Sequence, residues 1–314
     1  MRNTKGIKRL LRISACLAGI CALLTMKQNN QEDFMLLYTK ANTEASPETR
    51  TFETEADVIT SVVTTESAVL AENQTGWHEN ADRERYYIDK SGKKKIGYFK
   101  VSGSHYYAKK NGMIVTDQWK YIKIDGRKYK LYFGDNGKQK QNVSAILGEQ
   151  KQYRLEVNIQ KNVVIVYAKD ENGEYCIPVK AMICSCGVPG HSTITGNYSY
   201  LRKTGKWHTL YYGTYGKYCT RISGPYLFHS VVYSRNGDDY SLYADEFEKL
   251  GKAASHGCVR LQVKDAKWIY NHSSKCSAYL YRDNKQLPLK KPIAADLVEL
   301  ENGKVCDPTD TDVN

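Results

Sequence analysis

The residues best suited to chemistry lie in one short stretch, Ser-His-Gly-Cys-Val-Arg at positions 255–260. A cysteine becomes a nucleophile when a base or a positive charge stabilises its thiolate, so Cys258 is the candidate nucleophile and His229, upstream, the candidate base. Gly257 allows close backbone approach, and the amides there can bind a developing oxyanion. Arg260 can either fix the turn or hold a substrate carboxylate. Singly, each residue is more often structural, so the prediction depends on their combination.

The amino-terminal segment predicts export. Five basic side chains precede an apolar run at residues 13–26, which is the arrangement of a signal sequence. The run is shorter than the about 20 residues of a comfortable membrane span, and no clear small-x-small cleavage site follows it. Residues 1–30 are therefore expected to be a signal peptide or a signal anchor, and the only contact with the membrane.

Charge is distributed unevenly along the chain, whose formal net charge is +12. Residues 31–75 are expected to form a flexible acidic linker, because their composition is rich in Thr, Glu, Ser and Ala. Residues 76–140 hold 16 Lys/Arg against 7 Asp/Glu, and such a basic block predicts an anionic partner. Since the chain is expected to be exported, nucleic acid is excluded and an anionic wall polymer is favoured.

A degenerate repeat occupies residues 76–140. Tyr-Tyr-Ile-Asp-Lys-Ser-Gly at 86–92 recurs as Tyr-Tyr-Ala-Lys-Lys-Asn-Gly at 106–112 and as Leu-Tyr-Phe-Gly-Asp-Asn-Gly at 131–137. Each unit predicts a β-hairpin, with an aromatic strand, a Ser-Gly or Asn-Gly turn and a second strand. Single hairpins cannot bury their aromatic faces, so a short stacked solenoid is expected.

The chain changes character over residues 150–284, where a mainly β domain is predicted. Strands are predicted for three apolar runs, at residues 153–159, 162–168 and 176–183. The one convincing helix is predicted at residues 264–270. The polar segment 285–314 is expected to be a loose tail.

Cysteine usage also bears on function. Of nine cysteines, seven lie beyond the amino-terminal segment, and an odd number in an exported domain indicates one free, reactive thiol. Cys184 and Cys186 have a spacing unsuited to structural zinc, and no C-x-x-C motif occurs. The sequence therefore predicts no metal site and no cofactor, and it leaves the disulfide pairing open.

The stretch at 255–260 resembles, without a gap, the signature of the L,D-transpeptidase catalytic domain, the YkuD-like fold. The resemblance covers about 135 residues and includes His-Ser at 229–230, Leu-Gly at 250–251 and Asp-Ala at 265–266. Ser185-Cys186-Gly187 and the segment 192–198 occupy the place of a further family segment, although its usual proline is absent. The resemblance implies a YkuD-like β-sandwich after the hairpin repeats.

The resemblance also implies roles for individual residues. Cys258 is expected as the nucleophile, His229 as the proton acceptor and donor, and His256 as a neighbour that orients or tunes the thiolate. Ser255 is expected as an adjunct, with the oxyanion hole at the amides of Gly257 and Cys258. Substrate contacts are expected from three further residues, Arg260, Tyr226 and Ser230. The implied activity is peptidoglycan cross-linking by acyl transfer from a tetrapeptide stem through a Cys thioester.

The repeats resemble cell-wall-binding repeats that bind choline or glucan in surface proteins of Gram-positive bacteria. Trp77 and Trp119 are the two tryptophans of this block, few for the Trp pairs of a choline cage, so choline binding is doubtful. A wall glycan or an anionic wall polymer is the expected partner of residues 76–140. The expected location is the wall, or the outer face of the cytoplasmic membrane, of such a bacterium.

Two alternatives stay open at this point. Water can replace the acceptor amine, which would make the protein an L,D-carboxypeptidase. The chain can also be a wall-binding protein with weak catalytic activity. NlpC/P60-type peptidases and sortases fit the sequence less well, because the former place Cys before His and the latter place Arg well after the Cys.

Overall fold

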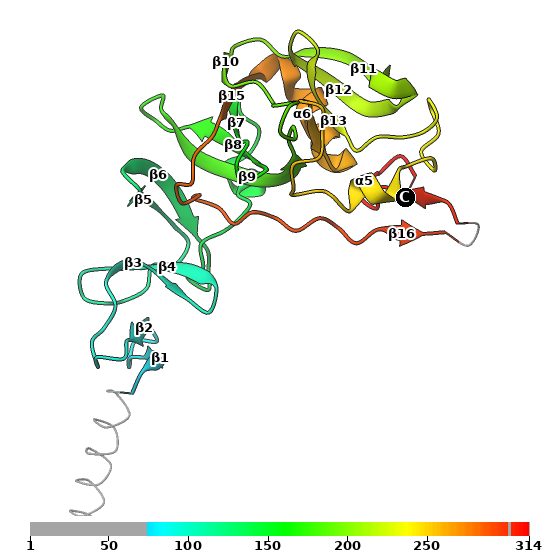
Figure 1. The fold of residues 1–314 in the computed structure, drawn as a ribbon. Helices are drawn as coiled ribbons and strands as arrows, with labels where there is room; N and C mark the ends of the chain where they lie inside the picture. Colours follow the sequence, from blue (N-terminus) through cyan, green and yellow to red (C-terminus); the bar gives the residue numbers. More distant parts are fainter. Residues whose placement is uncertain (1–73, 301–302, 314) are drawn as a thin grey trace, which may run out of the picture. The chain divides into compact units, whose positions relative to one another are not determined.

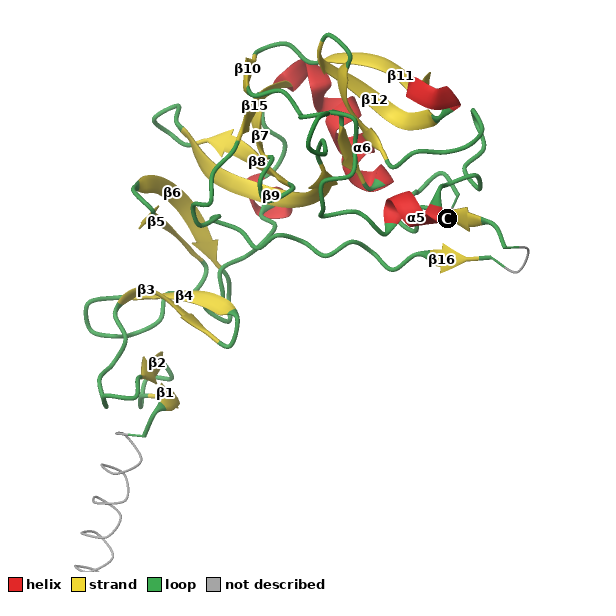
Figure 2. Ribbon diagram, in the orientation of Figure 1, coloured by secondary structure: helices red, strands yellow, loops and turns green. Residues whose placement is uncertain are grey.

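The computed structural model describes residues 74–300 and 303–313. The predicted export segment and most of the acidic linker lie outside the described residues. Among the residues described, no helix is long and apolar enough to cross a membrane. Contacts between Cα atoms group residues 70–314 into one compact unit, drawn in Figures 1 and 2.

A curled sheet of nine strands forms the larger part of this unit, in the order β10-β15-β7-β8-β9-β14-β13-β12-β11. Its strands are β7 (Tyr153–Asn158), β8 (Val163–Lys169), β9 (Tyr175–Ser185), β10 (Gly196–Tyr198), β11 (Arg202–Thr209), β12 (Tyr215–Ser223), β13 (Tyr226–Ser230), β14 (Val259–Leu261) and β15 (Cys276–Tyr281). Strands β7, β8 and β9 confirm the three predicted apolar runs. The protein is mainly β and consistent with a YkuD-like fold.

Helix α6 (Val263–His272) packs against β12, β13 and β14, as Figure 1 shows. Its buried residues are Val263, Asp265, Ala266 and Ile269, whose spacing places them on one helical face. The helix confirms the predicted one at 264–270, with one further residue at its start and two at its end. The remaining helical turns are short, namely α4 (Ser144–Leu147), α5 (Ala244–Phe247), η1 (Tyr211–Gly213) and η2 (Ser273–Lys275).

Three two-stranded hairpins precede the large sheet. They pair β1 (Gly76–Glu79) with β2 (Arg85–Ile88), β3 (Gly97–Val101) with β4 (Ser104–Ala108), and β5 (Gln118–Ile124) with β6 (Arg127–Phe133). Aromatic rings pack from one hairpin to the next, as between Trp77 and Tyr106, whose centroids lie 4.6 Å apart. The third hairpin shares a hydrophobic cluster with β8. The predicted hairpins are present, whereas a solenoid as such stays a prediction.

The turns of these hairpins differ from the prediction. Strands β3 and β4 are joined at Ser102-Gly103, and strands β5 and β6 at Asp125-Gly126, where both residues of each turn have positive φ, as a tight two-residue hairpin requires. The chain also reverses at the predicted Ser-Gly and Asn-Gly turns, but there its two sides pair only through one isolated bridge. At Asn111-Gly112 this bridge joins Ala108 with Ile114. The repeated motif therefore links consecutive hairpins.

The carboxyl-terminal segment is not the loose tail that its polar composition predicts. Strands β16 (Val298–Glu299) and β17 (Val305–Cys306) pair with each other, and Asp307 and Asp310 are buried. Asp307 accepts the backbone N–H of Val263 at 2.7 Å and so caps helix α6. The prediction was wrong because these acidic side chains find buried donors far away in the sequence.

Asp310 reaches Lys217, whose side chain is completely buried in β12, at 2.5 Å. Asp239 and Asp312 also lie within 3.1 Å of this ammonium group. Removing one partner of a buried ion pair leaves charge poorly compensated. We expect Asp310→Ala to lower the free energy of unfolding by roughly 2 kcal/mol, measured by urea denaturation. The exposed Asp296→Ala is the matched control; equal stability of both variants would contradict the tail's structural role.

Candidate active site

Cys258 and His229 are brought together by the parallel pairing of β13 with β14. In this register Phe228 lies opposite Val259 and His229 opposite Arg260. Cys258 directly precedes Val259, so the candidate nucleophile lies next to Leu227 of β13, two residues before the candidate base His229. Side chains two residues apart on a strand share a face, and Cys258, His229 and Arg260 accordingly line one pocket.

The loop that carries Cys258 is held by the end of β9. The backbone N–H groups of Ala254 and Ser255 both donate to the carbonyl of Cys186, at 2.9 and 3.0 Å. The hydroxyl of Ser255 donates to the carbonyl of Cys258 at 2.5 Å and accepts the N–H of Gly257 at 3.1 Å. Ser255 is thus a support for the loop, which fits the expected adjunct role.

Gly257 is required by the geometry of this loop. Its φ is +112°, and a Cβ atom there would lie 2.7 Å from Cε1 of Tyr226, closer than any side chain tolerates. Because its N–H is already bonded to Ser255, the expectation that the Gly257 amide serves an oxyanion hole is not met in this structure. The amide of Cys258 itself remains the candidate donor.

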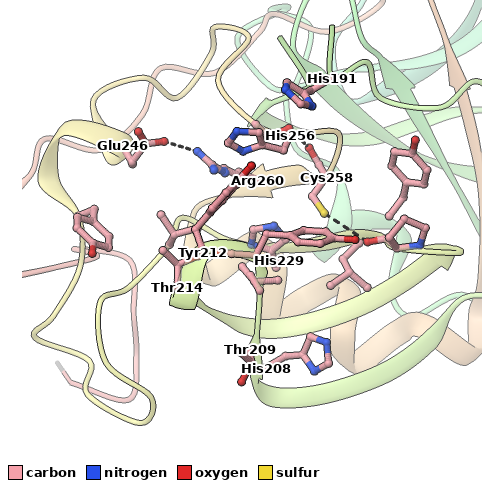
Figure 3. A pocket seen from close by; sticks show the side chains of 18 of the residues that line it. His191, His208, Thr209, Tyr212, Thr214, His229, Glu246, His256, Cys258 and Arg260 are labelled. Atoms are coloured by element: carbon pink, nitrogen blue, oxygen red, sulfur yellow. Dashed lines mark hydrogen bonds and ion pairs between the residues drawn. The ribbon is translucent and has the colours of Figure 1, made fainter.

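The pocket has a volume of about 870 Å³, within the range of small-molecule sites. One wall is the signature loop and β13, and the other is the tip between β11 and β12 with Tyr211 and Tyr212. Tyr212 lines the pocket although its side chain is 82% exposed, so its ring lies at the pocket edge. Its backbone has a φ of +60°. The ring of Tyr212 lies beside that of His256, with centroids 5.3 Å apart, as Figure 3 shows.

The thiol of Cys258 is protonated at rest. Burial raises its pKa, although the Leu227 amide and the positive charges of Arg260 and Arg221 partly oppose that rise. The Sγ atom donates to the Pro225 carbonyl at 3.7 Å, as the dashed line in Figure 3 marks. The proton must therefore turn away from this carbonyl before a base can take it.

His229 is buried and uncharged near neutral pH. Burial foremost, and then the charge of Arg260, lower its pKa to about 3. Its Nδ1 lies 2.6 Å from the Ser230 carbonyl, so Nδ1 carries the proton and Nε2 is left as the acceptor. A Cβ on Gly216 would lie 3.0 Å from this Nδ1, so glycine in β12 lets the imidazole sit against the backbone.

Arg260 makes structural contacts in this pocket, and its predicted contact with a substrate carboxylate stays a prediction. Its Nη1 forms an ion pair with Glu246 of α5, and it donates to the carbonyl of Ala254 at 3.1 Å. Arg260 therefore fixes the turn, and its charge also acts on Cys258 and His229. Tyr226 lines the pocket and supports Gly257, so its predicted contact with substrate stays a prediction.

The prediction that Ser230 binds substrate was wrong. Ser230 is completely buried, its Oγ accepts the N–H of Lys217 at 2.8 Å, and its hydroxyl donates to the Val231 carbonyl at 2.6 Å. Alternation along β13 explains this placement, since His229 faces the pocket and the next residue must face the core. Ser230 instead ties β13 to β12.

His256 lies in the pocket wall but packs mainly on other rings. Its centroid lies 4.9 Å from that of His191 and 5.3 Å from that of Tyr212, as Figure 3 shows. Its expected effect on the thiolate stays a prediction. His191 and His208, which the sequence analysis did not single out, also line the pocket. His272 instead stacks on Trp268.

The seven cysteines in the described part of the chain are all unpaired, and six are buried while Cys258 is partly exposed. Cys258 is thus the accessible thiol among them. Asp170, Glu174 and Cys176 have ligand atoms within 4.8 Å of one another. The Asp170 carboxylate already accepts the N–H groups of Asn172 and Glu174, so it organises its own turn.

One known protein family matches the part of the chain that carries this site. Residues 152–278 match the YkuD family, the L,D-transpeptidase catalytic domain. The chain therefore contains a YkuD domain, which spans β7 to the middle of β15 and includes Cys258 and His229.

Individual relatives resemble parts of the chain. Over 49 residues it is 49% identical to the Bacillus subtilis protein YciB, whose name assigns it provisionally to the L,D-transpeptidases. The match covers 16% of this chain and 24% of YciB, so the chain matches about a quarter of that relative.

Solved structures overlap with the chain in part. An L,D-transpeptidase from Mycobacterium smegmatis is 14% identical, covering 55% of this chain and 70% of its own, with a TM-score of 0.30. A choline binding domain from Streptococcus pneumoniae is 27% identical, covering 21% of this chain and 84% of its own, with a TM-score of 0.18. With TM-scores below 0.5, these overlaps support no conclusion about activity.

Proposed function

We propose that the protein is an exported peptidoglycan L,D-transpeptidase in which Cys258 carries the acyl group. The observation that supports this most is the partly exposed thiol of Cys258 beside His229 in one pocket of a YkuD domain. The substrate would be a tetrapeptide stem of peptidoglycan, at the wall or the outer face of the membrane. The hairpins of residues 76–140 would hold the enzyme on a wall polymer.

The proposed reaction has two acyl transfers. The proton of Cys258 passes to Nε2 of His229 as sulfur bonds to the carbonyl carbon of stem residue three. The C–N bond to the terminal D-Ala breaks, and His229 returns the proton to the departing amine. An amine of a second stem then bonds to the same carbon, its proton passes to His229, and the C–S bond breaks to restore the thiol.

The electrostatics of the pair predict how acylation responds to pH. The reactive form has neutral His229 and protonated Cys258, and it persists between the lowered pKa of the imidazole, about 3, and the raised pKa of the thiol. We expect the acylation rate to stay constant from pH 7.5 to 5.5, where a histidine with an ordinary pKa of about 6.5 would lose about tenfold. Single-turnover acylation by a tetrapeptide measures this.

Circular dichroism at each pH serves as the control for folding. A tenfold fall in acylation towards pH 5.5, with the fold intact, would show that His229 is charged in that range and contradict the proposed resting state.

Product analysis tests the reaction itself and separates the alternatives. The full chain is incubated with disaccharide tetrapeptide, and the products are examined by mass spectrometry. A cross-linked dimer that has lost one D-Ala supports transpeptidation, whereas a disaccharide tripeptide alone indicates an L,D-carboxypeptidase. Unchanged substrate together with binding to isolated walls would favour the remaining alternative, a wall-binding protein.

A further inference from the structure

A second hollow, distant in sequence from the signature, is ringed by lysines. Lys100 of β3, Lys123 of β5, Lys161 and Lys290 line it, together with the aromatic side chain of Tyr98. Its volume is about 730 Å³. We call this site the lysine hollow. It combines residues of two hairpins with residues of the YkuD domain and of the carboxyl-terminal segment.

Lysines in and near the hairpins differ in whether they have an acidic partner. Five hairpin lysines form ion pairs with carboxylates, namely Lys95, Lys109, Lys128, Lys130 and Lys140. Within the residues that the structure describes, none of the ammonium groups that line the hollow pairs with a carboxylate. Four positive charges therefore line one hollow whose lining holds a single carboxylate, that of Asp125, and this excess favours an anionic ligand.

Asp125 is the one acid among the lining residues, so the hollow keeps an excess of positive charge. Asp125 accepts the backbone N–H of Gln286 at 2.7 Å, so it closes the β5–β6 turn onto the carboxyl-terminal segment. The hollow is also fixed in shape. Tyr98 donates to Gln139 at 2.8 Å, and Gln139 donates to the Pro288 carbonyl at 2.7 Å, which ties the first wall to the opposite one.

Two stacked rings are among the side chains that line the hollow. The rings of Tyr98 and His105 lie 4.9 Å apart and 13° from parallel. Burial, followed by the charges of Lys100 and Lys290, lowers the pKa of His105, so the imidazole already lies in the positive field of the hollow. An aromatic ring suits the carbon backbone of a sugar or alditol, and the ammonium groups suit phosphate.

We propose that the lysine hollow binds the phosphodiester groups of an anionic wall polymer with a sugar or alditol backbone. This rests on the proposed function, because it requires that the chain works at the wall. It also extends the binding surface beyond the repeats, since Lys161 and Lys290 lie outside residues 76–140. The YkuD domain and the hairpins would then be held on the polymer as one body.

The test compares two variants of the full chain with the same change in charge. One replaces the four lysines of the hollow, with Lys100→Gln, Lys123→Gln, Lys161→Gln and Lys290→Gln. The control replaces four exposed lysines of the linking turns, with Lys90→Gln, Lys93→Gln, Lys110→Gln and Lys138→Gln. Sedimentation with walls measures binding, before and after acid extraction of the phosphate polymer.

We expect the hollow variant to bind intact walls at least about tenfold more weakly than the control, and extracted walls to lose the difference. Glycerol phosphate, used as a soluble probe, should raise the pKa of His105, followed by NMR of its ring protons. Equal binding by both variants, or binding that ignores extraction, would overturn the proposal. Turnover of soluble disaccharide tetrapeptide should be unchanged in both variants; if the unmodified chain gives no turnover, the proposed activity fails separately.

Discussion

Replacement Cys258→Ala is expected to abolish turnover of disaccharide tetrapeptide, by about 10⁴-fold or more, while the fold is kept. Alanine removes only the sulfur atom, which donates a long hydrogen bond to the Pro225 carbonyl. Little packing is lost, because Cys258 is the partly exposed cysteine of the described set. Initial rates from product analysis measure the effect.

The matched control is Cys219→Ala, which removes a neighbouring thiol that is completely buried and does not line the pocket. This control is expected to lose stability, by about 1–2 kcal/mol for a small cavity, but to keep its catalytic chemistry. Cross-linking by the Cys258 variant at the rate of the unmodified chain would remove the nucleophile from the proposal.

His229→Gln is expected to slow acylation by about a hundred- to ten-thousandfold. Glutamine keeps a polar side chain of similar reach, but its amide cannot accept the thiol proton as a base. Because the imidazole has a low pKa and presents Nε2 as an acceptor, the loss should appear in the acylation step. Single-turnover measurements with tetrapeptide separate this step from the later transfer.

His272→Gln is the suitable control, since His272 stacks on Trp268 at the end of α6, outside the pocket. His191 is less suitable, because it lines the pocket beside His256. Equal, mild losses in the His229 and His272 variants would show that the base had been misassigned.

Much of the fold follows from short-range pattern. The apolar runs that became β7, β8 and β9 have the composition of buried strands, and α6 buries positions three and four residues apart. The pairing of Cys258 with His229 could be predicted only from the resemblance of the signature. The parallel register that joins β13 to β14 depends on strands far apart in the chain, which no local pattern specifies.

The errors have physical causes that were partly visible in the sequence. Alternation along β13 already implied that Ser230 faces away from His229, so its substrate role could have been excluded. Helix α6 begins after Gln262, which has no side-chain capping bond, and that gap is filled by Asp307 from the tail. The tail's own sequence is polar, and its order depends on partners elsewhere in the fold, such as the buried Lys217.

The pocket edge shows what sequence reasoning missed altogether. His208 lies near the end of β11 and Tyr212 in the turn that follows this strand, and both line the site. Nothing in their spacing indicates this. The left-handed φ of Tyr212 is a property of the fold, and a signal for it exists only in the neighbouring Gly213.

Covalent capture of the acyl group tests the central claim most directly. The full chain is mixed with a tetrapeptide donor in the absence of an acceptor, quenched with acid, and its intact mass and proteolytic peptides are measured. The proposal predicts an increase equal to the donor minus D-Ala, carried by the peptide that contains Cys258 and absent from Cys258→Ala. A chain that releases D-Ala without ever carrying this adduct, or that carries it on another residue, would contradict the proposal.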